Sequence, residues 1–249
     1  MVKPRARKRD NSKFYMTLGA IAIAGAAAVG YATTRSGRAE TPTTIDPALL
    51  ASGVPQGFVM GSPDAPVEIV EYGDFECGWC AQFATVTEPD VRQRLVQTGK
   101  ARFRFVDFPL AMHRNTMSAH LAAGCAADQN KFWEMHDRIF QGQNEWNGAA
   151  TSNPKKVLAG YARELRLDED TWEQCFDDRK HLPRIQASMA EGSRLRVSST
   201  PTFIVNGKMM PSSISYDALK AMVDSAAPAP ATAPAATPPQ TDASTPKRP

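Results

Sequence analysis

The sequence predicts an α/β fold in which a central mixed sheet, flanked by helices, is interrupted by a long all-helical insertion. A strand–helix–strand pattern lies at residues 67–108, and a strand–turn–strand–helix pattern lies at 201–225. Between them, residues 112–196 show helical periodicity and no strand pattern. Neither half holds enough strands for a core of its own. We therefore expect one folded domain, residues 56–225, with the helical block inserted into it.

The first half of this domain opens with VEIVEY, residues 67–72, where apolar and acidic side chains alternate as in a strand. Residues 78–98 follow with helical character, and Pro89 is expected to kink or divide that helix. Alternation returns in ARFRFVDF, residues 101–108, which predicts a second strand. A right-handed crossover through the helix would make the two strands parallel.

Amphipathic helices are expected within the insertion, in the stretches MSAHLAAGCAADQ, KFWEMHDRIF and KKVLAGYARELRL. The second of these carries an apolar stripe that favours packing in the core over binding of a cofactor. Its members are Phe132, Trp133, Ile139 and Phe140.

The second half of the sheet begins with PTFIVNG, residues 201–207, which has the composition of a strand. Asn206-Gly207 is a strong hairpin signal, so a short antiparallel strand should follow at 208–210. A helix at about 215–225 should close the domain.

The N-terminal region predicts a membrane segment. Residues 14–32 form a run of 19 residues without a charge, which as a helix would span ~28 Å, close to the ~30 Å hydrocarbon core. Lys and Arg gather in residues 1–13, which places that basic segment in the cytoplasm. We expect a transmembrane anchor, with a cleaved signal peptide as the alternative. Either one exports the rest of the chain to a compartment that permits disulfides.

Two other segments are not expected to fold by themselves. Residues 33–55 are polar and interrupted by proline, as in a linker, and residues 226–249 are mostly Ala, Pro and Thr, as in a disordered tail. The formal net charge of the 249 residues is +3, and the basic excess lies beside the apolar run. No nucleic-acid partner is therefore expected.

Cys77 and Cys80 lie two residues apart in DFECGWCAQF, residues 74–83. A structural zinc site needs four ligands, usually as two close pairs, but Cys125 and Cys175 stand singly and no histidine pair has matching spacing. We expect no metal and no other cofactor. A purely structural disulfide would close too short a loop to stabilise the fold much.

A reactive dithiol fits the position of this pair at the end of a strand and the start of a helix. The helix N-terminus favours a thiolate at Cys77, the attacking sulfur, and Cys80 is one turn further in, where it can resolve a mixed disulfide. Gly78 and Trp79 add no charge, so a lowered pKa at Cys77 should come mainly from the helix end. Trp79 either faces the substrate or covers the thiols.

The stretch YGDFECGWC, followed far downstream by STPTFIVNG, resembles the thioredoxin superfamily. The helical insertion narrows the resemblance to DsbA-like thiol–disulfide oxidoreductases, over about residues 55–225. It implies a thioredoxin fold with a cis bond before Pro201, where Thr200 and Pro201 lie against the dithiol and hold an extended substrate. It also implies that Glu71 is a buried acid with a raised pKa that shuttles a proton for Cys80.

The two remaining cysteines lie in the insertion. Two left-over cysteines in an oxidising setting tend to pair, and some DsbA-like proteins have a second disulfide in this region, so we expect Cys125 and Cys175 to form one. Two buried free thiols are the alternative. Glu76 is expected to be exposed. The histidines are interpreted as helix-surface or core residues, not as ligands or bases: His113, His120, His136 and His181.

The resemblance implies an exported enzyme that introduces disulfides into reduced or unfolded exported proteins. Its catalytic domain would be periplasmic, tethered to the bacterial cell membrane by a single span, or secreted if the signal is cleaved. A quinone-linked thiol oxidase in the membrane would re-oxidise it. A reductase or isomerase of the same fold, and a chaperone-like binding module, remain as alternatives.

Overall fold

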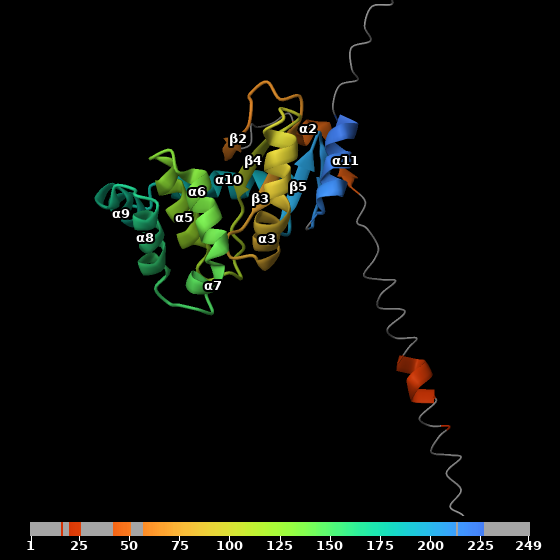
Figure 1. The fold of residues 1–249 in the computed structure, drawn as a ribbon, viewed down its shortest axis with the longest axis horizontal. Coiled ribbons are helices and arrows are strands. Elements are labelled where there is room, and N and C mark those ends of the chain that lie inside the picture. Colours follow the sequence, from red (N-terminus) through yellow and green to blue (C-terminus); the bar gives the residue numbers. More distant parts are fainter. Residues whose placement is uncertain (1–15, 17–19, 26–41, 51–56, 213, 227–249) are drawn as a thin grey trace, which may run out of the picture. The chain divides into compact units, whose positions relative to one another are not determined.

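The computed structural model describes residues 16, 20–25, 42–50, 57–212 and 214–226 (Figure 1). The chain divides into two units, residues 1–41 and 42–249. In the first unit, residues 20–25 are helical, and Ile21 and Ile23 are exposed. The rest of the expected membrane segment, apart from Met16, lies outside the described residues. Among the helices that are described, none has the length and apolar character needed to cross a membrane.

The strands described in the second unit form a single mixed sheet (Figure 1). They are β1 (Thr43–Thr44), β2 (Phe58–Met60), β3 (Glu68–Gly73), β4 (Arg102–Asp107), β5 (Thr202–Val205) and β6 (Lys208–Met210). Their spatial order is β1-β6-β5-β3-β4-β2. β3 and β4 are parallel, as the crossover predicted, and the other neighbouring pairs are antiparallel. β3 therefore joins the two halves of the sheet, because it pairs with β4 of the first half and with β5 of the second.

The predicted hairpin between β5 and β6 is confirmed. Asn206 and Gly207 have φ angles of +47° and +74°, and Val205 pairs with Lys208 across the turn. Both central residues adopt left-handed backbone conformations, which Asn and Gly accept more readily than other residues.

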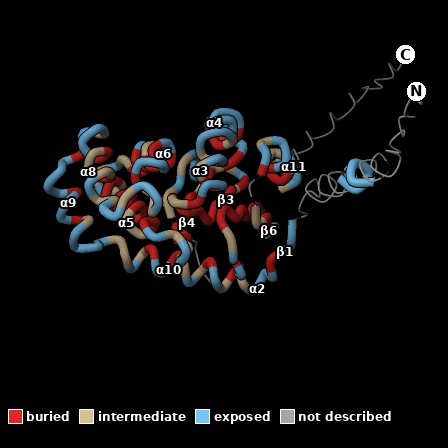
Figure 2. The backbone as a smooth tube through the Cα atoms, turned by 90° about the horizontal axis from the view of Figure 1, so that it is seen from below, coloured by how far each residue is buried: buried red, intermediate tan, exposed pale blue. Residues whose placement is uncertain are grey.

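Helices cover both faces of the sheet (Figure 2). One face carries α3 (Gly78–Gln82), α4 (Glu88–Val91) and α11 (Tyr216–Ala226), and the other carries α2 (Pro47–Leu50) and α10 (Leu182–Arg194). Alternate residues of β3 therefore enter different cores. Ile69 packs in the core beneath α3, whereas Val70 and Tyr72 pack in a second core with Leu195.

Pro89 does not divide the helix that follows β3, and the alternative expectation, a kink at Pro89, stays a prediction. The chain stays helical from Gly78 to Val96 through α3, η1 (Phe83–Thr87), α4 and η2 (Arg92–Val96). η1 and η2 are π-helical segments, and Pro89 stands in the first turn of α4. The wider π turn before Pro89 accommodates a residue that lacks a backbone N–H.

The insertion forms a group of helices at one end of the sheet (Figure 1). They are α5 (Thr116–Ala127), α6 (Phe132–Gln141), α7 (Gln143–Trp146), α8 (Pro154–Glu164) and α9 (Glu169–Asp177). The apolar stripe of α6 packs in the core as predicted: Phe132, Ile139 and Phe140 are buried, and Trp133 is half-buried against them. One apolar core runs from the sheet into the insertion, so the two parts are expected to fold together.

The folded domain begins earlier than residue 56. β1 and α2 lie within the expected linker 33–55, and β1 pairs with β6. Ile45 is buried, and its backbone N–H donates to the carbonyl oxygen of Gly207 over 2.8 Å. β2, which the sequence did not predict, pairs with β4. Such short edge strands form because a neighbouring strand supplies hydrogen-bond partners, so they need little hydrophobic periodicity of their own.

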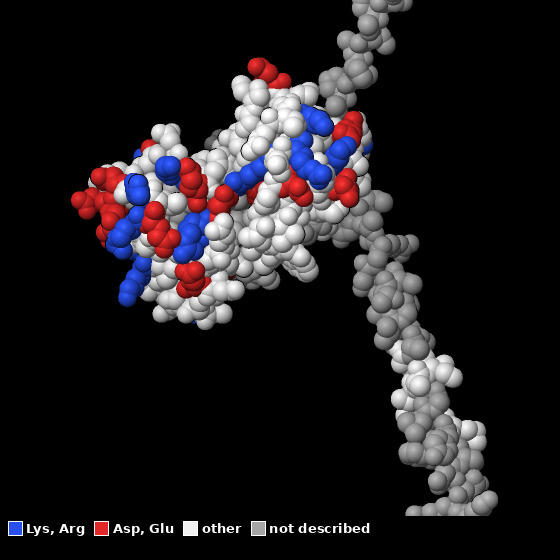
Figure 3. Space-filling model, in the orientation of Figure 1, with Lys and Arg blue, Asp and Glu red and all other residues white. Residues whose placement is uncertain are grey.

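Charged side chains of both signs are mixed on the face shown in Figure 3. On the insertion they pair with one another, as in Lys155–Glu173, Arg163–Glu169 and Arg138–Glu164. This face therefore lacks the single-sign basic patch that typifies nucleic-acid binding.

Candidate active site

The turn after β3 places the two cysteines at the start of the long helix. Cys77 is the residue that caps α3, with extended backbone angles of φ −75° and ψ 122°. Its backbone N–H donates to the carbonyl oxygen of Asp74 over 3.0 Å, which closes the turn. The Cys77 sulfur thus lies beside the first N–H groups of the helix, and Cys80 lies one turn further in. Both thiols are free in this structure, and both residues are buried.

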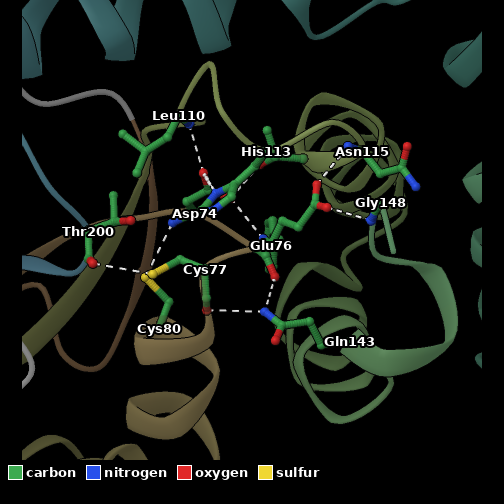
Figure 4. A network of polar contacts seen from close by, with 12 residues as sticks. Asp74, Glu76, Cys77, Cys80, Leu110, His113, Asn115, Gln143, Gly148 and Thr200 are labelled. Atoms are coloured by element: carbon green, nitrogen blue, oxygen red, sulfur yellow. Dashed lines mark hydrogen bonds and ion pairs between the residues drawn. The ribbon is translucent and has the colours of Figure 1, made fainter. Parts of the chain in front are cut away.

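The second sequence motif meets the dithiol, as expected. The bond between Thr200 and Pro201 is cis. Cys77 Sγ lies 3.3 Å from the main-chain oxygen of Thr200, to which the thiol donates (Figure 4). Thr200 and Pro201 are themselves buried next to the start of β5.

The pKa of the Cys77 thiol is lowered from 9.0 to about 5. The largest cause is a hydrogen bond from the Cys80 side chain to the Cys77 sulfur, and burial opposes it. The Thr200 side chain and hydrogen bonds from the backbone N–H groups of Cys80 and Trp79 lower the pKa further. The helix end therefore contributes as predicted, but it is not the main cause. The partner thiol is the main cause because its hydrogen bond favours the charged form of Cys77.

Cys80 has the opposite character. Burial raises its pKa well above 9.0, and the hydrogen bond it gives to Cys77 and the charge of Glu71 add to the effect. The backbone N–H of Asp74 lies 3.5 Å from Cys80 Sγ (Figure 4). The pair is thus asymmetric: Cys77 is a thiolate at neutral pH, and Cys80 remains a protonated thiol.

Glu71 lies in the middle of β3, paired with Phe105 of β4 and Phe203 of β5. The residue is 1% exposed, and neither of its carboxylate oxygens has a hydrogen-bond partner among the described residues. Burial raises its pKa well above 4.5, and the charges of Glu88 and Cys77 raise it further. A carboxyl with a pKa raised in this way keeps its proton to higher pH than an exposed carboxyl does, which suits general acid–base exchange with a neighbouring thiol.

Asp74 organises the turn, and sequence reasoning missed it. Its side chain accepts hydrogen bonds from the backbone N–H groups of Glu76, over 2.8 Å, and Leu110, over 2.7 Å. It also bonds to the Thr116 hydroxyl and lies 2.8 Å from His113 Nδ1 (Figure 4). His113 is therefore brought close to the dithiol turn. An acid directly after a buried strand was the signal that could have drawn attention to Asp74.

Glu76 is half-buried, so the expectation that it is exposed is wrong. Its carboxylate accepts from the backbone N–H of Asn115, over 2.6 Å, and from that of Gly148 (Figure 4). Gln143 of α7 adds a second link, because its side-chain amide donates to the carbonyl oxygens of Phe75 and Cys77. These bonds hold the insertion against the dithiol turn, a contact that local sequence cannot show.

The other residues singled out in the sequence are Trp79, the cysteines of the insertion and three histidines. Trp79 is 63% exposed, which removes the alternative that it covers the thiols. Cys125 of α5 and Cys175 of α9 form a disulfide with 5.8 Å between their Cα atoms, as expected. His120 and His136 are buried, and His181 lies 3.0 Å from Asp128.

The chain is similar to a known protein family and to several known proteins. The thioredoxin family model matches residues 54–225. A Salinispora arenicola protein named Na(+)/H(+) antiporter NhaA 1 is 40% identical over 169 residues, which cover 68% of this chain and 24% of that protein. A Bacillus anthracis protein named probable disulfide bond formation protein D is 26% identical over 174 residues, covering 66% of this chain and 76% of that one.

Among solved structures, oxidised BdbD from Bacillus subtilis matches with a TM-score of 0.62 and 20% identity, covering 75% of this chain and 97% of that one. The likeness shows a shared fold. The chain spans about a quarter of the length of the Salinispora protein. Most of the protein that carries the antiporter name therefore lies outside the match.

Proposed function

Because this chain belongs to the thioredoxin family and is a DsbA-like member of it, we propose that it is a thiol–disulfide oxidoreductase that introduces disulfides into other proteins. The observation that carries the proposal is the asymmetry of the dithiol. Cys77 has a pKa of about 5, and Cys80 has a pKa well above 9.0. A stabilised thiolate at Cys77 favours the reduced dithiol, and an enzyme whose reduced form is stabilised is an oxidant.

The lowered pKa of Cys77 sets an upper limit on the shift of the reduction potential. The pKa of Cys77 lies about two units below the value near 7 that is typical of the reducing protein thioredoxin. For a two-electron couple, each unit corresponds to about 30 mV, so the thiolate makes this dithiol at most about 60 mV more oxidising. That shift favours disulfide donation over reduction.

The reaction starts from the Cys77–Cys80 disulfide. A substrate thiolate attacks Cys77 Sγ, a new bond joins substrate and Cys77, and Cys80 leaves with the electron pair and takes up a proton. A second substrate thiolate then attacks the substrate sulfur of the mixed disulfide. Cys77 leaves as its stabilised thiolate, so the substrate is oxidised by two electrons and the enzyme dithiol is reduced.

Substrate recognition is proposed to rest on two elements beside the sulfurs. Main-chain groups next to Pro201 would pair with an extended segment of substrate, which gives little sequence preference. Trp79 and Met112, which are 63% and 82% exposed, would supply apolar contacts. The surface over α3 carries no charged side chains in Figure 3, which suits unfolded chains of varied sequence.

The proposed location is outside the cytoplasm, at the bacterial cell membrane. The Cys125–Cys175 disulfide supports it, because such bonds persist in oxidising compartments. Residues 14–32 would serve as the anchor, or as a cleaved signal segment. Thiol re-oxidation is proposed to depend on a quinone-linked oxidase in the membrane.

The test combines a reduction potential with two activities. The full chain is equilibrated with glutathione buffers and then assayed for insulin reduction and for refolding of a reduced disulfide-containing protein. We expect a potential clearly above that of thioredoxin, about −270 mV, and better activity in refolding than in insulin reduction. A potential near −270 mV would favour the reductase alternative. Refolding activity that persists in Cys77→Ser would favour a chaperone-like module.

A further inference from the structure

A buried polar cluster lies between the helix that carries the dithiol and helix α6 of the insertion. Glu88 and His136 are both fully buried, and His136 Nε2 lies 3.8 Å from Glu88 Oε2. Arg92 links the cluster together: it lies 2.6 Å from Glu88 Oε1 and 2.5 Å from Asp137 Oδ1. Of the four residues, only Asp137 reaches the surface substantially, with 36% of its side chain exposed.

Several buried atoms of this region have no hydrogen-bond partner among the described residues. They are both carboxylate oxygens of Glu71, Oε2 of Glu88 and Nε2 of His136. Native proteins pair nearly all such atoms, so exceptions need a physical reason. A role in proton transfer is one such reason, because a group that accepts and releases a proton in turn cannot keep one fixed hydrogen-bond partner.

We propose that Glu88 and His136 carry the proton that Cys80 exchanges, passing it between Glu71 and the surface at Asp137. This inference rests on the dithiol exchange proposed above and adds a route for its proton. In the first step of that exchange, Cys80 leaves as a thiolate and takes a proton from Glu71. His136 passes a proton from the surface to Glu88, and Glu88 then restores the Glu71 carboxyl. When the dithiol is re-oxidised, the same proton leaves in the reverse direction.

Burial makes such a route necessary. Cys80 is fully buried and Glu71 is 1% exposed, so neither can exchange a proton directly with bulk water. Glu88 acts electrostatically on Glu71, and Glu71 acts in the same way on Cys80. At the other end, Asp137 and Arg92 line a cavity of about 390 Å³ together with Ala84, Thr85, Pro89, Phe140 and Gln141.

The surroundings of His136 suit both tautomers of its ring. Nδ1 lies 2.9 Å from Asp137 Oδ1, which can only accept, and 3.5 Å from Arg92 Nη2, which can only donate. With the hydrogen on Nδ1, the ring donates to Asp137, and Nε2 can accept a proton from Glu88. With the hydrogen on Nε2, Arg92 donates to Nδ1, and the Nε2–H faces Glu88 Oε2 at 3.8 Å, so the two groups must approach for the proton to pass. An imidazole that is stable in both states can take a proton at one nitrogen and release it at the other.

Other charged groups on the elements packed against this route are paired elsewhere. The pairs are Asp90–Arg94, Lys131–Glu134, Arg138–Glu145, Arg138–Glu164 and His120–Asp107. Of these, Glu134 is coupled electrostatically to Asp137 at the surface end of the route. The other titratable groups that act on the route are its own members, Arg92 and the dithiol. Cys77 contributes by raising the pKa of Glu71.

The experiment measures how fast the oxidised full-length protein is reduced by dithiothreitol, by rapid acid quench and mass spectrometry, over a range of pH. We expect Glu88→Gln and His136→Ala to slow the reduction about 100-fold at neutral pH, the lower end of the range for general acid–base catalysis. Glu88→Gln keeps the shape of the side chain and a hydrogen-bond acceptor for Arg92, so it tests the route without opening a cavity.

Imidazole provides the decisive readout. Added imidazole should restore the rate of His136→Ala in a saturable manner, because it can replace the missing ring. His120→Ala is the matched control: it removes a histidine that is equally buried and also contacts Phe75 and Phe105, but that pairs with Asp107. Its rate should not respond to imidazole.

Two results would overturn the inference. One is a wild-type rate and pH profile in both Glu88→Gln and His136→Ala; the other is a slow His136→Ala that imidazole does not restore. A wild-type protein that dithiothreitol does not reduce would instead contradict the dithiol chemistry itself. The two failures are thus distinguishable.

Discussion

Cys77 Sγ lies 3.3 Å from the main-chain oxygen of Thr200, although 123 positions separate the two residues in the chain. The contact joins the start of the dithiol helix to the residue before the cis bond at Pro201. It depends on β3 and β5 being neighbours in the sheet, since the helix follows β3 and Thr200 precedes β5. The reactive sulfur is therefore positioned by both halves of the sheet at once.

The titration of Cys77 depends on its partner thiol. We expect the rate of Cys77 alkylation by iodoacetamide, measured on the reduced protein against pH, to show a midpoint at about 5. In Cys80→Ala the midpoint should rise, because the largest stabilising contribution to the thiolate is the hydrogen bond from Cys80. An unchanged midpoint in that variant would show that the helix end alone sets the pKa.

Glu71 is expected to lower the stability of the fold. Burial raises the pKa of Glu71 in the folded state well above 4.5. Below pH 4.5 the carboxyl is protonated in both the folded and the unfolded chain, so its titration costs no stability there. As the pH rises above 4.5, the unfolded chain releases the proton and the folded chain keeps it, so stability falls by about 1.4 kcal/mol per pH unit until the folded pKa is reached.

The variant Glu71→Leu tests this directly. It should unfold at higher urea concentration than the wild type, by an amount that grows from acid to neutral pH. Its reduction by dithiothreitol should be slower, because Cys80 loses its proton donor. Equal stability of the two proteins at every pH would mean that Glu71 is paired or hydrated in solution. Glu68→Leu, on the same strand but half-buried and bound to Arg102 and Arg104, should show no such gain.

Asp74 should be required for the shape of the dithiol turn. Asp74→Ala leaves the backbone N–H groups of Glu76 and Leu110 without their acceptor. Since each of the two unsatisfied donors costs about 1–3 kcal/mol, we expect a loss of about 2–6 kcal/mol in urea unfolding. Asp74→Asn keeps one acceptor oxygen and should lose less. Asp64→Ala, an exposed control, should stay close to wild type, and a similar loss in both alanine variants would refute this role.

The disulfide in the insertion is expected to contribute stability and not reactivity. It closes a loop of 50 residues between α5 and α9, for which the chain-entropy model gives about 4 kcal/mol as an upper figure. The double variant Cys125→Ala/Cys175→Ala should therefore unfold at lower urea concentration. Its rate of reduction by dithiothreitol should match that of the wild type. A large drop in rate would show that the disulfide takes part in the exchange.

Much of the architecture followed from local patterns. Alternating side chains located β3 and β4, strand-like composition located β5, helical periodicity located the insertion, and Asn206-Gly207 located the hairpin. Edge strands β1 and β2 were missed because their stability comes from hydrogen bonds to a neighbouring strand rather than from their own periodicity. Pro89 does not divide its helix, because a π turn before it accommodates the missing N–H.

The sequence by itself determined the dithiol and its position at a helix N-terminus, because these depend on residues a few positions apart. It also predicts that Cys77 is the residue that attacks. Only the tertiary structure decided what surrounds the dithiol. Asp74, Glu76 and Gln143 join it to the insertion, and Thr200 meets Cys77 from the far half of the sheet. Hydrogen bonds and burial act between groups that are close in space. The pKa asymmetry of Cys77 and Cys80 and the isolation of Glu71 therefore arise only once the chain has folded.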